Sequence, residues 1–340
     1  MGASLRRTGG RKINIFQRER AETVKAGYNN ITGIGMNGKY PSTKKRDPVM
    51  ASLPAKKALP LPPLEELSAH EAAIVAARWN ENPLIPVPEG YHLESDASAY
   101  FKAADCPHSP YFPAPDFYHM YSRGSLTILP CFRTYQQTRS YSCGSAIALM
   151  TLYHFGCRDW KELDIADRMA SFHGLPPETR RPVPVKDMVR FFRSIGWDVE
   201  SNLPFARRIP DVEGPYNPWR ADEAKTFPTL ESFARFVRGT LKDGAPIMVE
   251  NIDWGGHWRV IIGYDDMGTD KPEHGVLILA DPHDTADHCQ DGYVMEHIDR
   301  FYCTWYDVFV MERDECTQPW LVARPPHLKE EKSCVKSVKN

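Results

Sequence analysis

Residues 144–155 place the strongest constraint on how this chain can fold, because nearly all of them are apolar. A helix over this segment would have no polar face, so it must lie at the centre of a core with other elements packed around it. Gly156 then ends the helix. The run is well short of the ~18 apolar residues that cross a bilayer, so we expect a buried helix of a globular protein.

Helical patterns surround this segment, and strand patterns follow it. We predict further helices over residues 64–80 and 164–173, from Pro184 to Gly196, and from the N-cap Thr229 to just before Gly244. Short β-branched or aromatic runs predict strands over residues 247–250, 257–264, 276–280, 293–296 and 305–311. Helices first and antiparallel strands afterwards indicate an α+β fold, with a helical half packed on a sheet half.

The composition limits the partners and the compartment that we expect. The 42 basic and 44 acidic residues give a net charge of −2, which excludes a uniformly basic nucleic-acid binder. None of the eight cysteines forms a Cys-x-x-Cys pair, and no secretory signal is visible at the N-terminus. We therefore expect reduced thiols in the cytoplasm, where a cysteine can work as a nucleophile.

The segment from Gln137 to Gly144 carries the strongest chemical signal. Cys143 begins the buried helix, where partial positive charge and free N–H groups stabilise a thiolate. Gly144 allows close packing and leaves room for a substrate carbonyl beside the sulfur. Gln137 can aim an amide N–H at the oxyanion that forms when the thiolate attacks, whereas Gln136 should project away. Taken alone, Cys143 could instead be a small buried hydrophobic residue.

A thiolate nucleophile needs a base, and His257 is the best candidate. This histidine begins an apolar strand after two glycines, Gly255 and Gly256, which allow another segment to approach closely. His154 lies on the same helix as Cys143, ~16 Å further along it, and cannot reach the sulfur.

Asp281 is the candidate that would hold the imidazole in the right tautomer. It follows the strand over residues 276–280 and precedes Pro282. If that strand pairs with the His257 strand across a turn at residues 265–275, Asp281 returns to the His257 end. Asp253 and Asp265 are rivals, although Asp265 lies at the far end of the His257 strand.

Three other patterns fail as cofactor or metal sites. Gly33 to Tyr40 nearly spells a P-loop, but Tyr40 stands where Ser or Thr must hold magnesium. The pair His70-Glu71 begins like a zinc-protease helix, but Ile74 stands where the second histidine belongs. The segment from Asp281 to Cys289 has metal-ligand residue types without zinc or calcium spacing, so we interpret it as a polar loop. We expect neither a cofactor nor a metal.

In this order, these residues resemble the papain-like cysteine peptidases, and in particular the bacteriocin-leader-processing (double-glycine) peptidases and their stand-alone relatives. The shared pattern comprises Gln137, Cys143-Gly144, Gly156, His257-Trp258, Gly263-Tyr264-Asp265 and Asp281-Pro282, with Ile298 to Phe301 and Trp305 similar to the closing strand region. The resemblance implies a papain-like fold. It also implies that Cys143 is the nucleophile, His257 the base and acid, Asp281 the orienting residue, and Gln137 the oxyanion donor.

The resemblance covers about residues 130–310 and suggests how the chain is divided. We expect a basic, disordered tail and linker over 1–63, an N-terminal extension over 64–129, a papain-like catalytic domain over 130–315 and a C-terminal tail over 316–340. Ser142 stands where transporter-linked members often carry an acidic residue. An insertion around residues 266–274 lengthens the hairpin, and residues 1–129 lie outside the match. Because of these departures, a double-glycine substrate does not follow from the resemblance.

Three functions remain open at this point. The leading hypothesis is a thiol hydrolase that cleaves a peptide or related amide through an acyl-enzyme on Cys143. An acyl transferase of the phytochelatin-synthase or transglutaminase type would use the same triad, and a non-catalytic binding module would carry a vestigial one. We expect a peptide or protein substrate, and neither a membrane nor a nucleic acid as partner.

Overall fold

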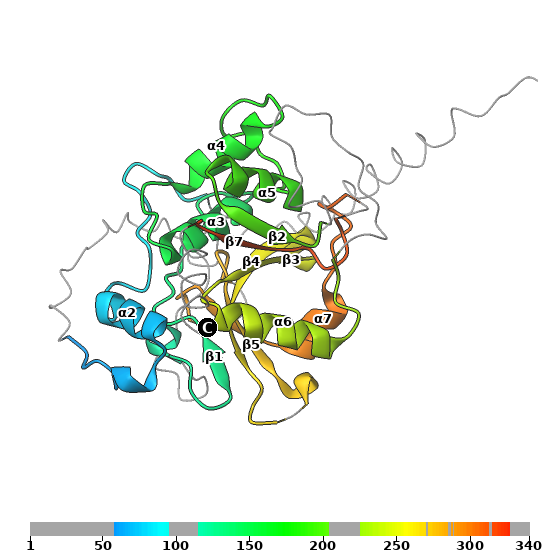
Figure 1. The fold of residues 1–340 in the computed structure, drawn as a ribbon. Coiled ribbons are helices and arrows are strands. Elements are labelled where there is room, and N and C mark those ends of the chain that lie inside the picture. The colour runs from blue at the N-terminus through cyan, green and yellow to red at the C-terminus, as the bar shows by residue number, and fades with distance from the viewer. Residues whose placement is uncertain are drawn as a thin grey trace, which may run out of the picture. The chain divides into compact units, whose positions relative to one another are not determined.

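The computed structural model describes residues 58–94, 115–203 and 225–326, apart from residues 270, 285–286, 288 and 313–314. The greater part of the expected N-terminal tail, residues 1–57, therefore lies outside the described residues. The elements are α2 (Ala69–Arg78), β1 (Leu126–Ile128), α3 (Cys143–His154), α4 (Glu162–Ser171), α5 (Val185–Ser194), β2 (Asp198–Ser201), α6 (Leu230–Lys242), β3 (Ile247–Asn251), β4 (His257–Asp265), β5 (Val276–Ala280), β6 (Tyr293–His297), α7 (Ile298–Thr304) and β7 (Trp320–Arg324) (Figure 1).

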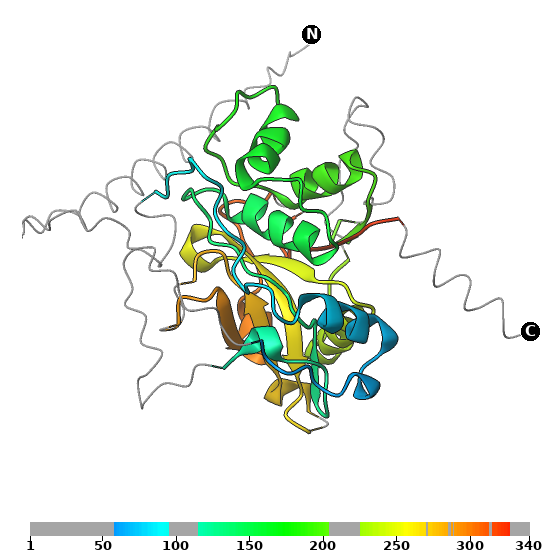
Figure 2. The ribbon, with the colours of Figure 1, turned by 90° about the vertical axis from the view of Figure 1, so that its left-hand side faces the viewer.

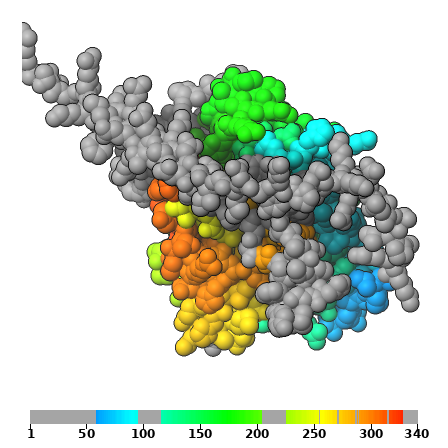
Figure 3. Space-filling model, turned by 180° about the vertical axis from the view of Figure 1, so that it is seen from behind, coloured from blue at the N-terminus to red at the C-terminus, as the bar shows by residue number. Residues whose placement is uncertain are grey.

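The strands form one antiparallel sheet in the order β2-β7-β3-β4-β5-β6, and β1 pairs with the C-terminal end of β4. Helices α3, α4 and α5 gather on one side of this sheet, and α6 and α7 lie on the other (Figures 1 and 2). Seen from behind, the helical half is green and the sheet half is yellow and orange (Figure 3). The predicted α+β fold, with a helical half packed on an antiparallel sheet half, is confirmed.

Helix α3 lies at the centre of the core, as its sequence predicts. Every residue from Gly144 to Leu152 is buried. At its C-terminal end, the imidazole of His154 is hydrogen-bonded to the carbonyl of Gly244, 2.9 Å away, just after α6. Trp258 of β4 links the sheet half to the helical half. Its indole N–H donates to the carbonyl of Val183, just before α5, at 2.8 Å.

Capping boxes fix where two helices begin. The hydroxyl of Thr229 accepts the backbone N–H of Ser232, so α6 begins at Leu230, as predicted. Ser68 makes the same arrangement with Glu71, and α2 therefore begins at Ala69. The predicted helix over 64–80 is thus too long at its start, where residues Leu64–Glu66 form only a 3-10 turn.

The prediction for residues 298–311 is wrong. Residues Ile298–Thr304 form helix α7 and not part of a strand region. The strand predicted over 305–311 is absent, because the Asp307 carboxylate accepts the backbone N–H groups of Phe309 and Val310, at 2.6 and 3.2 Å. These bonds fold the segment into a turn whose N–H groups cannot join a ladder.

Three segments outside the predicted strands belong to the sheet, and one of them, Asp198–Ser201, forms the edge strand β2. Residues Trp320–Arg324, which we expected in a C-terminal tail, form β7 between β2 and β3. Residues Leu126–Ile128, which we expected in the N-terminal extension, form β1. The sheet therefore extends beyond residues 130–315 at both ends. Within the described part of the chain, every helix is too short or too polar to span a bilayer.

Candidate active site

Cys143 occupies the first position of α3, as predicted, and its side chain is partly buried. The helix start packs tightly at the next residue, because a Cβ on Gly144 would lie only 3.0 Å from the Cβ of Val183. The glycine thus brings the nucleophile candidate close to the segment that precedes α5. This packing, seen in the structure, gives Gly144 a role that is independent of any substrate.

His257 and Asp281 meet as the predicted hairpin requires. Strands β4 and β5 are antiparallel with Val260 opposite Ala280, so the residue after β5 returns to the start of β4. The Nε2 atom of His257 lies 2.7 Å from Oδ1 of Asp281, and both side chains are buried. The Cys143 thiol lies near enough to the same imidazole to raise its pKa, and because Asp281 occupies Nε2, Nδ1 is the ring atom left to face the sulfur.

Asp281, His257 and Cys143 shift the pKa values of one another's side chains. Burial alone would raise the pKa of Asp281, but the His257 imidazole and the backbone N–H groups of His283 and Asp284, at 2.8 and 3.2 Å, hold it well below its ordinary value. Burial alone would lower the pKa of His257, but the Asp281 carboxylate and the Cys143 thiol raise it well above its ordinary value. The imidazole is therefore a strong acceptor for the proton of the thiol.

The rival acids and the second histidine have other partners. The Asp253 carboxylate accepts from the side chains of Asn251 and Arg259, at 2.8 and 3.3 Å. Asp265 lies at the far end of β4, opposite Val276, where it accepts the backbone N–H of Met267. His154 lies at the far end of α3 from Cys143. In the described residues, it is Asp281 that bonds to His257.

Gln137 lies next to Asp281, where a backbone hydrogen bond holds it in place. Its N–H donates to the carbonyl of Pro282, 3.0 Å away, next to Asp281. Its side-chain amide donates to the carbonyl of Arg139 at 2.9 Å, inside the loop that leads to Cys143. An amide nitrogen carries two N–H hydrogens, so a second donor remains after this bond. Gln136 is buried as well, and its amide nitrogen has no hydrogen-bond partner among the described residues.

Comparison with known proteins identifies the family. The sequence matches the Peptidase_C39 like family over residues 131–306, which is more than half of the chain. The chain belongs to this family. It is also similar to the crystal structure of the peptidase domain of Streptococcus ComA, described as a bifunctional ABC transporter involved in quorum sensing. The identity is 13%, the TM-score is 0.32, and the match covers 57% of this chain and 98% of that one. No curated protein matches the sequence significantly.

Sequence reasoning missed a buried acid in this member of the family. Glu162 begins α4, two residues before the predicted helix start, and its carboxylate is fully buried. It accepts hydrogen bonds from Tyr135, Thr138 and Ser142, all in the loop that carries Gln137 and leads to Cys143. Burial raises the pKa of Glu162, although these donors favour the ionised carboxylate. No spacing in the sequence indicated this contact.

A second buried acid lies close to the triad. Glu250 of β3 and Asp307 are both buried, and their carboxyl groups lie close to each other. Burial, this partner and the nearby Cys143 raise the pKa of Glu250 to about 12, so it is protonated at neutral pH. A Cβ on Gly256, the residue before His257, would lie 2.6 Å from Oδ2 of Asp307 and 3.0 Å from Oε1 of Glu250. The acid pair therefore packs directly against the turn that leads into the candidate base.

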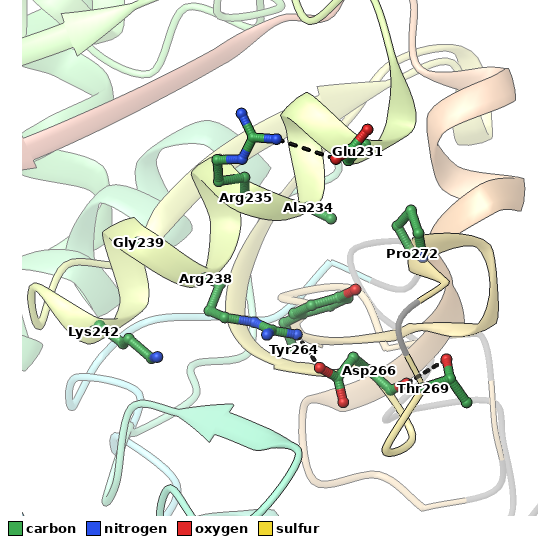
Figure 4. Close-up of a pocket in the computed structure, with 10 residues that line it drawn as sticks. All are labelled: Glu231, Ala234, Arg235, Arg238, Gly239, Lys242, Tyr264, Asp266, Thr269 and Pro272. Atoms are coloured by element: carbon green, nitrogen blue, oxygen red, sulfur yellow. Dashed lines mark hydrogen bonds and ion pairs between the residues drawn. The ribbon is translucent and has the colours of Figure 1, made fainter.

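A pocket of about 430 Å³ lies elsewhere, between α6 and the β4–β5 hairpin (Figure 4). Its two arginines are already paired, Arg235 with Glu231 at 3.2 Å and Arg238 with Asp266. None of its lining residues belongs to the Cys143 group. We therefore do not place the substrate of this family member there.

Proposed function

We propose that this chain is a cysteine peptidase that cleaves a peptide or protein through an acyl-enzyme on Cys143. The observation that carries the proposal is that the His257 imidazole is hydrogen-bonded to Asp281 and lies near the Cys143 thiol at the start of α3. Nucleophile, base and orienting carboxylate grouped in this way are the arrangement that activates a weak nucleophile. Membership of a peptidase family supports the same reaction type.

In the first step, His257 removes the proton of the Cys143 thiol, and the sulfur adds to the carbonyl carbon of the substrate. The start of α3 assists this step, because its N–H groups and positive end stabilise negative charge on the sulfur. Asp281 keeps Nε2 of the ring occupied, so that Nδ1 faces the sulfur, and it stabilises the imidazolium that forms.

The tetrahedral intermediate then collapses to a thioester. The second amide N–H of Gln137 and the backbone N–H of Cys143 are the donors that we assign to the oxyanion. His257 gives its proton to the leaving amine, and afterwards removes a proton from the water that hydrolyses the thioester. The reaction returns Cys143 to its thiol form.

Wild-type protein and a Cys143→Ala variant, each incubated with a peptide library, test this proposal. Mass spectrometry should find peptides with new termini in the wild-type reaction and none with the variant. A parallel reaction with added amine distinguishes transfer from hydrolysis, because an acyl transferase would give mainly the amine adduct. If the Cys143→Ala variant cleaves as fast as the wild type, or if neither protein forms a product, the proposal is wrong.

A further inference from the structure

The carboxylate of Glu162 is the centre of a closed hydrogen-bond network. Its Oε1 atom accepts the backbone N–H of Thr138 at 2.8 Å and the hydroxyl of Ser142 at 2.5 Å. Its Oε2 atom accepts the hydroxyl of Thr138 at 2.5 Å and that of Tyr135 at 3.1 Å. All four donors come from one stretch of eight residues, and the carboxylate itself has no solvent exposure.

This stretch connects the two groups that would act on the scissile carbonyl. Thr138 directly follows Gln137, and Ser142 directly precedes Cys143. Between these two positions the backbone forms only turns and bends, so regular secondary structure does not fix its length. By binding both ends, a single carboxylate sets how far the Gln137 amide lies from the sulfur.

We propose that Glu162 is a positioning residue, whose carboxylate holds the Gln137 amide and the Cys143 thiol at the separation that the transition state requires. The inference rests on the proposed function, because it assigns Glu162 an effect on the attack step. Misplacing a catalytic group by about 1 Å can cost ~10²-fold in rate, so a rigid anchor at this place matters more than its own binding energy. Glu162 touches no reacting atom and acts only through the loop.

The side-chain chemistry predicts a graded series. A carboxylate offers two acceptor oxygens, which match the four donors, whereas an alanine leaves all of them buried without this partner. A glutamine keeps the shape and one acceptor oxygen, and the hydroxyls of Tyr135 and Thr138 can turn to accept from its amide. We therefore expect Glu162→Ala to lower kcat by ~10- to 100-fold with KM changed less than ~3-fold, and Glu162→Gln to recover most of this loss.

The control is Asp164→Ala. Asp164 is an exposed acid in the same first turn of α4, so its removal affects the helix dipole equally but leaves the network intact. This variant should keep wild-type kcat. Rates are expressed per active site, counted by alkylation of Cys143. This corrects kcat for any unfolded protein in the variant samples.

A double-mutant cycle with Gln137→Ala decides between positioning and general support of the fold. If Glu162 acts by placing Gln137, Glu162→Ala should cost less than ~3-fold in the Gln137→Ala background, although it costs ~10- to 100-fold in the wild type. If Glu162→Ala fails to fold, the same cycle is run with Glu162→Asp, which keeps both acceptor oxygens but withdraws them from the loop by one methylene group.

Three results would overturn the inference: losses that multiply in the double variant, an equal loss in Asp164→Ala, or a loss confined to KM. These results all require an active wild type. An inactive wild type would instead refute the proposed function, so the two failures are distinguishable.

Discussion

His257 and Asp281 are joined by a 2.7 Å hydrogen bond between buried atoms, although 24 positions separate them in the sequence. The antiparallel pairing of β4 with β5 creates this contact.

If the pair works as a unit with Cys143, His257→Ala should abolish turnover as completely as Cys143→Ala. Asp281→Asn should cost less, ~10²- to 10⁴-fold in kcat/KM, because the aspartate orients the ring without taking the proton. Steady-state kinetics on one peptide substrate would measure both. A silent Asp281→Asn beside a damaging Asp253→Asn would contradict the assignment.

The same pair makes a pH-dependent contribution to stability. The lowered folded pKa of Asp281 adds stability above its unfolded pKa of about 4, and this is lost as the pH falls toward the folded value. The raised folded pKa of His257 adds stability below its unfolded pKa of about 6.5, and this is lost as the pH rises toward the folded value. The Tm advantage of the wild type over Asp281→Asn should therefore be largest between about pH 4 and 6.5 and shrink toward pH 9. A constant advantage over this range would refute the coupling.

Sequence periodicity predicted the buried helix and the approach of Asp281 to His257, because those signals are local. Helix α3 has no polar face, and the hairpin of β4 and β5 placed Asp281 by register alone. Strand β2, by contrast, is four residues with polar alternation, and it pairs with β7 more than a hundred residues later. Only that long-range pairing defines both strands. Glu162 was also missed because its contacts are long-range, since its hydrogen-bond donors come from a separate loop. The strand predicted over residues 305–311 was wrong because the turn at Asp307 outweighs the strand propensity of its neighbours.

Close packing at Gly144 makes this glycine intolerant of a side chain. Gly144→Ala would press a methyl group against Val183 and should lower the free energy of unfolding by about 1–3 kcal/mol. Gly239 of α6 is the matched control, since a Cβ there meets nothing within 4 Å. Gly239→Ala should raise stability by up to ~1 kcal/mol through helix propensity. Chemical denaturation of both variants would test this, and a stabilising Gly144→Ala would contradict the packing described.

The protonated state of Glu250 predicts an unusual stabilising substitution. Because its pKa is raised to about 12, the folded protein binds one more proton than the unfolded chain above about pH 4.3, and wild-type stability falls as the pH rises. Glu250→Gln keeps a neutral donor toward Asp307 and removes this proton uptake. Its Tm relative to the wild type should therefore increase steadily from pH 5 to pH 9. A Tm difference that does not change with pH would show that Glu250 is ionised in the folded protein.

Competitive alkylation of the cysteines tests the central claim most directly. Iodoacetamide at pH 7, followed by peptide mapping, compares the rate at Cys143 with that at Cys303, an exposed cysteine whose thiol lies 3.8 Å from the carboxylate of Asp299. Burial raises the pKa of Cys131 to about 12 and also raises that of Cys157, so both should react slowly. We predict that Cys143 reacts at least ~10-fold faster than Cys303 and that His257→Ala removes this advantage, because thiolate character governs the rate. Alkylation of Cys143 no faster than Cys303, or unaffected by His257→Ala, would contradict the proposed nucleophile.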